Sequence, residues 1–351
     1  MSGNRAWLAG LIVALLVLPL QLGAELNSLM ATAFLAAIGA IGLNIVTGWA
    51  GQVSLGHAFL LGIGAYTGAA LAGDPDGRVV GLGLPMWVWL PASGLVAAVV
   101  GLAVAPVATR LRGLYLAIVT LGLVFLGEHL FREVEDVTGG AGIGRPAPEL
   151  SLLGLDFDGR TEVLGIALDR PMKLYFLSLV LLIVLAILAR NLTRSAVGRA
   201  FAAVRDRDVA AELMGVELTK HKVIAFGVSS FYAGVAGAML ATVTGFIEPG
   251  TYDLFLSVEF LAMVLIGGAG TFAGPLLGAA FVTLLPRLVE EVPHLLPFIT
   301  TESSGGFLTV FQLQTIIYGC LIVGFLIAEP RGLFGLWVRA RNRFRTWSLS
   351  H

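Results

Sequence analysis

Residues 26–73 read LNSLMATAFLAAIGAIGLNIVTGWAGQVSLGHAFLLGIGAYTGAALAG, without one Asp, Glu, Lys or Arg. A helix needs about 20 apolar residues to cross the hydrocarbon core of a bilayer, so this stretch is long enough for two crossings. Glycines and polar side chains gather in its middle, between residues 47 and 57. We therefore predict two membrane spans joined by a turn, with a possible interruption of the helix over 47–57.

The composition of the whole chain extends this prediction. Of its 351 residues 57% are apolar and only 13% are charged, about half the charged share of a soluble domain. The 45 glycines favour close helix packing, because in an apolar chain small residues let helix backbones approach. We predict an all-α polytopic transmembrane helical bundle that forms a single transmembrane domain over residues 1–351.

The same composition argues against other classes of site. One cysteine, Cys320, excludes a disulfide framework and a thiolate metal cluster, and the five histidines lack metal-ligand spacing. A net charge of −1 leaves no basic surface for nucleic acid. We therefore expect no cofactor, no metal and no nucleic-acid partner.

Apolar runs divide the chain into about ten expected spans, and nine to eleven fit equally well. An even number places both termini on the same side of the membrane. The expected spans are 6–22, 29–47, 52–72, 87–107, 111–127, 174–189, 223–246, 256–268, 272–289 and 310–328.

The distribution of Lys and Arg predicts the orientation. With both termini cytoplasmic, 15 of the 22 basic residues fall on the inner side, as the positive-inside rule requires. Two polar segments then lie on opposite sides. Residues 128–173 form an external polar cap segment, and residues 190–222 form a cytoplasmic loop.

The cytoplasmic loop contains a short, modestly amphipathic helix. Ala202, Val209 and Leu213 fall near one face, charged side chains fall beside them, and Gly215 is a typical C-terminal stop. The mixed signs of charge favour docking of a soluble protein. A solvated loop, or a helix lying on anionic lipid headgroups, remains the alternative.

Polar side chains after the first long span are candidates for a substrate path. Gln52, Ser54 and His57 stand in an apolar stretch beside glycines, and polar groups within a membrane must face protein, water or a path. An interrupted helix can present free backbone groups to a zwitterion. Hydrogen bonding between helices is an equal alternative. Weaker candidates of the same kind are Asn44, Tyr66 and Thr67.

Two further sets of residues have simpler interpretations. Gly270, Gly274 and Gly278 repeat every four residues, which indicates helix packing, within the chain or with a second membrane subunit. Glu128 and Glu259 lie near expected span ends, where each is either a path residue or an interfacial carboxylate.

Several runs resemble a known family. The run 42–57, GLNIVTGWAGQVSLGH, continues to GIGAYT at 62–67; RGLYLAIVTL at 112–121, TGG at 138–140, SAVGRA at 195–200, AAELMG at 210–215, GGAGT at 267–271 and EPRGLFG at 329–335 follow. Together they resemble the permeases of branched-chain amino acid ABC transporters, most closely the M-type membrane subunit. The resemblance spans about residues 35–336.

This resemblance implies a set of partners: a second homologous permease, two ABC ATPase subunits and a periplasmic substrate-binding protein, in the lipid of a bacterial inner membrane. It also implies an ABC coupling helix over 199–215. An acidic residue is expected just before the paired alanines, where this chain has Val209, so Asp208 or Glu212 would have to substitute. The implied coupling residues are Arg199, Arg205, Asp206, Asp208, Ala210, Ala211, Glu212 and Gly215.

These observations predict a non-enzymatic permease subunit that moves branched-chain or related amino acids inward. No P-loop motif is present, since none of the three lysines follows a glycine, so partner subunits would hydrolyse ATP. The main alternative is an ion-coupled secondary carrier of small polar solutes, in which Glu128, Glu259 or His57 binds the coupling ion. A membrane-embedded enzyme is a distant third, because no catalytic pair is visible.

Overall fold

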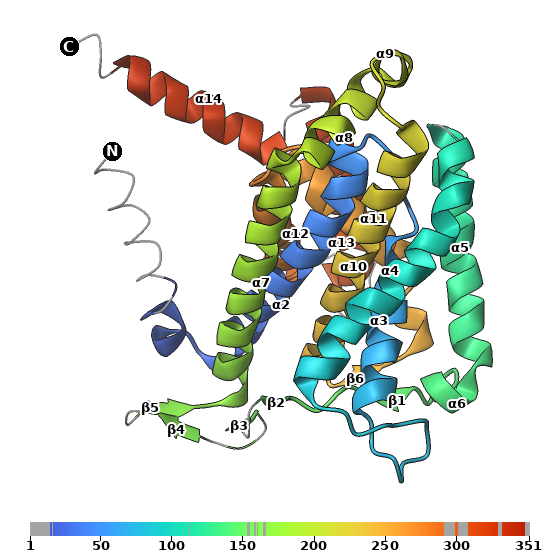
Figure 1. Cartoon of the computed structure of the whole chain (residues 1–351). Coiled ribbons are helices and arrows are strands. Elements are labelled where there is room, and N and C mark those ends of the chain that lie inside the picture. The colour runs from blue at the N-terminus through green and yellow to red at the C-terminus, as the bar shows by residue number, and fades with distance from the viewer. Residues whose placement is uncertain are drawn as a thin grey trace.

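The computed structural model describes residues 15, 17–111, 113–152, 155–157, 159, 161–163, 166–290, 299–300, 308–328 and 332–347. Within these ranges the chain is mainly helical (Figure 1). The helices are α2 (Ala24–Asn44), η1 (Ile45–Trp49), α3 (His57–Ala72), α4 (Met86–Arg110), α5 (Leu114–Glu133), α6 (Glu135–Thr138), α7 (Arg170–Arg194), α8 (Ala196–Asp206), α9 (Asp208–Leu213), α10 (Leu218–Thr244), η2 (Pro249–Thr251), α11 (Leu254–Gly267), α12 (Gly274–Glu290), α13 (Val310–Ala328) and α14 (Gly332–Trp347).

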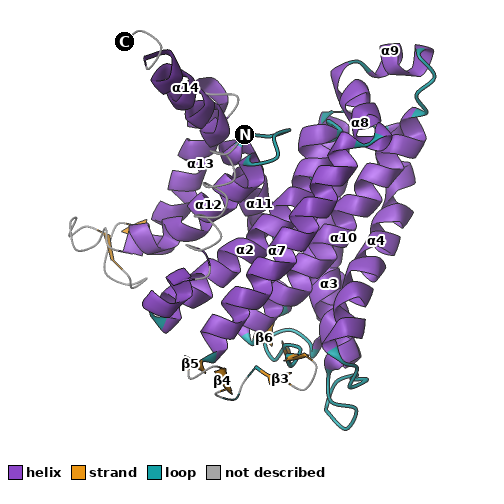
Figure 2. Ribbon diagram, turned by 60° about the vertical axis from the view of Figure 1, so that its left-hand side comes forward, coloured by secondary structure: helices purple, strands orange, loops and turns teal. Residues whose placement is uncertain are grey.

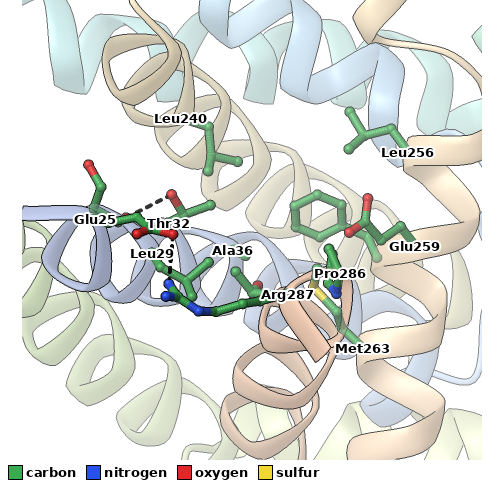
Figure 3. A pocket seen from close by; sticks show the side chains of 13 residues that line it. Glu25, Leu29, Thr32, Ala36, Leu240, Leu256, Glu259, Met263, Pro286 and Arg287 are labelled. Atoms are coloured by element: carbon green, nitrogen blue, oxygen red, sulfur yellow. Dashed lines mark hydrogen bonds and ion pairs between the residues drawn. The ribbon is translucent and has the colours of Figure 1, made fainter. Parts of the chain in front are cut away.

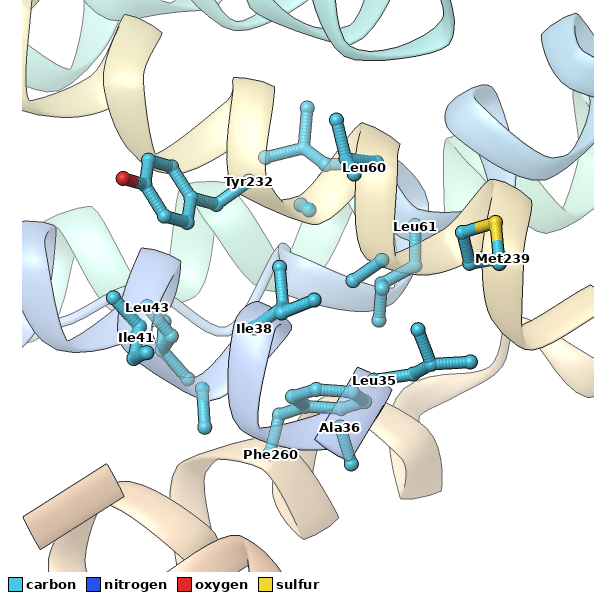
Figure 4. Close-up of a cluster of buried hydrophobic side chains, with 14 of the residues drawn as sticks. Leu35, Ala36, Ile38, Ile41, Leu43, Leu60, Leu61, Tyr232, Met239 and Phe260 are labelled. Carbon is cyan, nitrogen blue, oxygen red and sulfur yellow. The ribbon is translucent and has the colours of Figure 1, made fainter. Parts of the chain in front are cut away.

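Helix α2 lies at the centre of the bundle, between α7, α10, α11 and α12 (Figure 2). From Leu35 to Asn44 every residue of α2 is buried, which is typical of a helix surrounded by other helices. Figure 4 shows Leu35 and Ile38 of α2 among side chains of α3, α10 and α11. The first long apolar run of the sequence therefore forms the core.

Glycines allow α3, α4 and α10 to pack closely. A Cβ atom at Gly64 of α3 would collide with the backbone of Gly234 in α10, and one at Gly237 would collide with the Leu61 carbonyl group. Outward-facing residues of α4 and α7, such as Val99 and Val180, are more than half exposed. Helix contacts by small residues and apolar surface toward the surroundings are typical of membrane bundles.

The two polar segments lie at opposite ends of the bundle. Helices α8 and α9 cover one end, here called the inner end, and α14 lies at the same end. The opposite, outer end carries the short strands of the expected cap and one strand after α10. The cap strands are β1 (Arg145–Pro146), β2 (Ser151–Leu152), β3 (Leu155–Asp156), β4 (Thr161–Val163) and β5 (Ile166–Leu168), and the strand after α10 is β6 (Phe246–Ile247). Two more strands, β7 (Ile299–Thr300) and β8 (Leu308–Thr309), pair with each other in parallel.

Arg145 joins strand β1 to the bundle by hydrogen bonds. Strand β1 pairs antiparallel with β6 after α10, and the buried Arg145 side chain donates to the carbonyl oxygens of Ala69, Val80 and Val137. Burial lowers the pKa of this guanidinium group from its ordinary value. Three carbonyl acceptors offset the desolvation of the charge.

Six helices of the described part are long and apolar enough to cross a membrane: Ala24–Trp49, Met86–Val107, Tyr115–Glu133, Arg170–Arg194, Leu218–Thr244 and Pro249–Gly267. His57–Ala72 and Thr315–Phe325 are shorter apolar helices. The expected count of about ten spans and the cytoplasmic termini stay predictions. The first expected span, 6–22, lies largely outside the described residues.

Three expected boundaries were wrong. The expected span 52–72 is helical only from His57, because residues 50–56 are not helical. Helix α5 continues to Glu133 and α7 begins at Arg170, so both helices extend into the polar segment 128–173. Apolar runs locate the membrane core, whereas a helix continues into polar sequence as long as its backbone hydrogen bonds continue.

Candidate functional site

The long charge-free run is interrupted where the sequence predicted. Helix α2 ends in the π-helical turn η1, and the amide of Gln52 donates to the Val46 carbonyl oxygen at 2.9 Å. Gly51 follows with φ +69°, a conformation that favours glycine. The chain then runs without helix to His57, so this span consists of an irregular segment and the short helix α3.

Hydroxyl groups of neighbouring helices hold the irregular segment. The Leu55 amide donates to Thr120 Oγ1 of α5 at 2.9 Å, and the Ala58 amide donates to Ser257 Oγ of α11 at 2.9 Å. Backbone groups inside a membrane protein must find such partners when they leave a helix. The segment is therefore built into the bundle.

Two expected path residues have polar atoms available for a ligand. The side-chain amide atoms of the buried Gln52, Nε2 and Oε1, lack a hydrogen-bond partner among the described residues, and so does Nε2 of the buried His57. The His57 ring lies 5.1 Å from the Phe260 ring of α11, between centroids. Ser54 is also buried, and its hydroxyl group accepts from the Gly56 amide at 3.4 Å.

Asn44 is bonded on both sides of its amide group. Its Nδ2 donates to the Thr271 carbonyl oxygen at 2.9 Å, and its Oδ1 accepts from the Gly270 amide at 2.8 Å. These bonds join the end of α2 to the loop before α12. They favour the alternative role, hydrogen bonding between helices.

Tyr66 and Thr67 lie farther along α3. The Tyr66 ring packs against Phe131 at 4.9 Å and Tyr252 at 5.9 Å, between centroids, and its buried hydroxyl group has no partner among the described residues. Thr67 is half-buried. Of the six expected path residues, the structure brings Gln52, Ser54 and His57 together, with Asn44 beside the inner turn and Tyr66 and Thr67 in the outer half of α3.

Arg205 of α8 reaches the interrupted helix. Its Nη1 donates to the Gly48 carbonyl oxygen in η1 at 2.8 Å. Cβ atoms at Gly51 or Gly270 would come within 2.7 Å of the Arg205 side chain, so both glycines make room for it. We call Asn44, Gly48, Gly51, Arg205 and Gly270 the inner junction. Beside it lies a cavity of about 240 Å³ lined by residues that include Gln52, Arg207 and Lys222.

The expected cytoplasmic loop, 190–222, contains two short helices, α8 and α9, not the single helix expected over 199–215. Ser195 caps α8 by accepting from the amides of Val197 and Gly198. The backbone is extended at Arg207, with φ −156°, and α9 follows. The change of direction returns the chain toward α10, which a straight helix would not do. Gly215, with φ +84°, follows α9 as the expected stop.

The apolar residues of these helices point two ways. Phe201 and Val204 of α8 and Ala211 of α9 are buried. Leu213 and Met214 are 84% and 85% exposed, and Val209 is 60% exposed. Periodicity placed Val209 and Leu213 near one face of a single helix with Ala202, but in the structure they lie on α9, apart from the buried side chains of α8. They form an exposed apolar tip, with Ala210 and Glu212 also exposed.

The remaining expected coupling residues lie along α8 and at the start of α9. Arg205 Nε also donates to Asp206 at 3.1 Å, and the Asp208 carboxylate accepts from the Val209 amide at 2.8 Å. Arg199 is exposed on α8, and its Nη1 donates to the Arg194 carbonyl oxygen at 3.2 Å.

A second cavity, the outer cavity, lies between α2, α10, α11 and α12, with a volume of about 510 Å³ (Figure 3). Arg287 of α12 extends to Glu25 of α2, with Nη1 to Oε1 at 2.9 Å. Glu259 of α11 lines the same cavity and has neither an ion pair nor a hydrogen bond to any described residue. The lining residues are Glu25, Ser28, Leu29, Thr32, Ala36, Leu240, Leu256, Glu259, Phe260, Met263, Thr283, Pro286 and Arg287.

Comparison with known proteins identifies the family. Residues 26–326 match the family described as "Branched-chain amino acid transport system / permease component". The chain belongs to this family. It is therefore a multi-pass permease subunit of a transport system in the bacterial inner membrane.

Individual relatives with similar sequences are also permeases of import or transport systems. The high-affinity branched-chain amino acid transport system permease protein LivM of Salmonella typhimurium is 32% identical over 84% of this permease and 66% of its own length. LivM of Escherichia coli K12 is 32% identical over 94% of this permease and 75% of its own length. The autoinducer 2 import system permease protein LsrC of an Enterobacter species is 32% identical over 32% of the permease and 34% of its own length. No solved structure matches.

Two of the three spaced glycines, Gly274 and Gly278, lie in contacts between helices of the same chain. Cβ atoms at Gly274 and Gly278 of α12 would collide with Gly268 and Met263 in or next to α11. Gly270 precedes α12, in a loop with φ +73°, so it is not part of the helical repeat. The described packing of Gly274 and Gly278 is therefore between α11 and α12.

The outer cavity contains residues that sequence reasoning missed. Glu25 and Arg287 lie at opposite ends of the chain, and no spacing relates them. Glu259 and Glu128 looked equivalent, yet Glu128 pairs with Arg132 one turn away on α5, while Glu259 lines the cavity. An Arg four residues after Glu128 is a signal that the sequence did contain.

Proposed function

We propose that this permease imports branched-chain or related amino acids as one of two homologous membrane subunits, and that two ABC ATPase subunits supply the energy. A periplasmic substrate-binding protein would deliver the amino acid at the outer end. In this proposal ATP hydrolysis belongs to the partner subunits, and α8 and α9 are the coupling element within 190–222. The cap after α5 is the external segment.

The observation that carries the proposal is the contact of Arg205 with Gly48. Helix α8 faces the inner end, and Arg205 donates to the turn that interrupts the central span. A force on α8 would therefore act directly on η1 and on the irregular segment after it. Alternating access requires such a rigid contact between the energised element and the path.

The exposed apolar tip supports a protein partner at this end. Leu213 and Met214 are almost fully exposed beside Arg207 and Glu212, and such mixed surfaces are typical of protein interfaces. Differential affinity for the two conformations must come from ATP and the binding protein.

Reconstitution tests the proposal. The permease with its partners in proteoliposomes should accumulate labelled leucine only with ATP on the side of α8 and α9. L213D should reduce co-purification of the ATPase subunits and abolish uptake. Uptake by the isolated chain in liposomes without ATP would contradict the proposal.

One observation favours a second candidate, an ion-coupled secondary carrier. Glu259 stands on a candidate span without a polar partner in the described part of the chain, as the ligand of a coupling ion would. In that case uptake by the wild-type permease would depend on a proton or sodium gradient. Uptake by E259Q would be independent of this gradient.

A further inference from the structure

We propose that the outer cavity binds the zwitterionic end of an amino acid: Glu259 receives the ammonium group, and Arg287 receives the carboxylate group by exchange with Glu25. The inference rests on the proposed import of amino acids and names the residues that hold the substrate. It concerns an intermediate station in the membrane subunit, between the outer end and the interrupted helix.

Glu259 has the environment of a ligand-binding carboxylate. It lies on α11 within a membrane-spanning length of helix, next to the fully buried Phe260, and it has no polar partner among the described residues. A carboxylate in such a place is unfavourable unless a cation joins it. Figure 3 shows the Glu259 side chain at the opposite end of the cavity from Glu25.

Arg287 is already bound to a carboxylate, and weakly. The Arg287–Glu25 ion pair has side chains 41% and 79% exposed, and exposed ion pairs contribute little to stability. A substrate carboxylate can therefore replace Glu25 as the partner of Arg287, since a guanidinium group binds any carboxylate in this way. The two charged groups of an amino acid share one carbon atom, so binding of both requires Arg287 to turn from Glu25 into the cavity toward Glu259. Glu25 would hold Arg287 in place while the cavity has no substrate.

The rest of the lining suits an apolar side chain. Leu29, Leu240, Leu256 and Met263 face the cavity beside the two charged groups. A few placed polar groups in an otherwise apolar cavity are the usual composition of a small-ligand site. Leucine, isoleucine and valine combine the same two properties.

The cavity has an approach from the outer end and a barrier toward the inner end. Thr32, Leu240 and Leu256 also line an adjoining cavity of about 300 Å³, which includes Glu248 beside the cap strand β6. On the other side the Phe260 ring separates the outer cavity from His57. The site is thus placed before the irregular segment on the inward route.

Binding of leucine analogues to the full-length permease in lipid nanodiscs tests the site. 4-Methylpentanoate lacks the ammonium group, and 3-methylbutylamine lacks the carboxylate group. In the wild type only leucine should compete well with labelled leucine. E259Q should weaken leucine binding about tenfold or more, the loss expected for a charge-assisted contact. In E259Q the affinities for leucine and 4-methylpentanoate should become similar. In R287Q the affinities for leucine and 3-methylbutylamine should become similar.

Two variants guard against loss of folding. E25Q removes the competitor for Arg287 and should tighten leucine binding about twofold to fivefold, the effect of a weak exposed ion pair; misfolding cannot produce such a gain. E128Q changes a carboxylate that pairs with Arg132 away from the cavity and should leave binding unchanged. Unchanged binding in E259Q and R287Q, or weaker binding in E25Q, overturns the site.

Uptake by the complete transporter separates this proposal from the proposed function. If wild-type proteoliposomes take up leucine with ATP while E259Q, R287Q and E25Q behave like the wild type, only the site is wrong. If the wild type takes up no amino acid with ATP, the proposed function is wrong. If E259Q uptake becomes independent of an ion gradient, Glu259 binds a coupling ion and both are wrong.

Discussion

The outer cavity and the inner junction lie at opposite ends of α2 and are built in different ways. At the inner junction, Asn44 and Arg205 are bonded to backbone groups, and glycines fit around them. In the outer cavity, Glu25 and Arg287 form an exposed pair, and Glu259 has no polar partner among the described residues. The difference indicates a junction that transmits movement and a cavity whose contacts can be exchanged.

The largest effect should come from removing the amide group of Asn44. N44A leaves the half-buried Gly270 amide and Thr271 carbonyl group without their partner, at about 1–3 kcal/mol for each group. We expect the free energy of unfolding to fall by about 2–6 kcal/mol in total, measured by denaturant unfolding of the permease in detergent.

The matched variant in the outer cavity is T32A. Thr32 only donates to the Ser28 carbonyl oxygen of its own helix, so its loss should lower the free energy of unfolding by less than about 1 kcal/mol. Equal losses in N44A and T32A would remove the distinction between the two regions.

A methyl group at Gly270 should have the next largest effect. The residue has φ +73°, and its Cβ atom would collide with Arg205 and with the Gly48 carbonyl oxygen. We expect G270A to lower the free energy of unfolding by about 1–3 kcal/mol, through backbone strain and overpacking. G250A, where a Cβ atom would meet nothing within 4 Å, is the control. If G270A and G250A had the same free energy of unfolding, the inner junction would have room for a methyl group at Gly270, contrary to the structure.

Loss of the Arg205 side chain should reduce the amount of leucine imported for each ATP hydrolysed. R205A removes a charged hydrogen bond to Gly48, and because the side chain is 39% exposed we expect the lower end of the usual range, about 1.5 kcal/mol. Leucine uptake per ATP hydrolysed should fall about tenfold. R190A, an exposed Arg at the end of α7, should leave this ratio unchanged. Equal ratios in both variants would exclude Arg205 from coupling.

The smallest effect should come from the barrier between the two regions. F260L reduces the ring between the outer cavity and His57 to a smaller apolar side chain. Leucine should leak through the assembled transporter without ATP about threefold faster, which corresponds to roughly 0.7 kcal/mol of barrier. F125L, at an exposed Phe of α5, is the control. A leak rate equal to that of the wild type would place the barrier elsewhere.

The sequence predicted the interruption of the central run but not its neighbours. Gly48, Gly51 and the polar residues after them indicated a break, and η1 and residues 50–56 confirm it. Nothing in the sequence indicated that Arg205 would contact Gly48, because 157 residues separate them.

The candidate path shows the same limit. The sequence selected Gln52 as a path candidate and Asn44 as a weaker candidate, both as polar residues in an apolar run. The structure gives the side-chain amide of Asn44 two hydrogen-bond partners and the side-chain amide of Gln52 none among the described residues. Glu128 has a partner one turn away on its own helix, which the sequence could indicate, whereas Glu259 lines a cavity that four helices form. Contacts between helices depend on tertiary packing, which local patterns do not describe.

The sequence alone determined that this protein is a polytopic helical bundle, where its main apolar helices lie and which family it resembles. These properties follow from the length and hydrophobicity of contiguous runs and from short motifs, which are local along the chain. Only the tertiary structure decided which charged and polar groups are bonded, exchangeable or left facing a cavity. The physical reason is that an ion pair such as Glu25 with Arg287 forms only when α2 and α12 pack together, at opposite ends of the sequence.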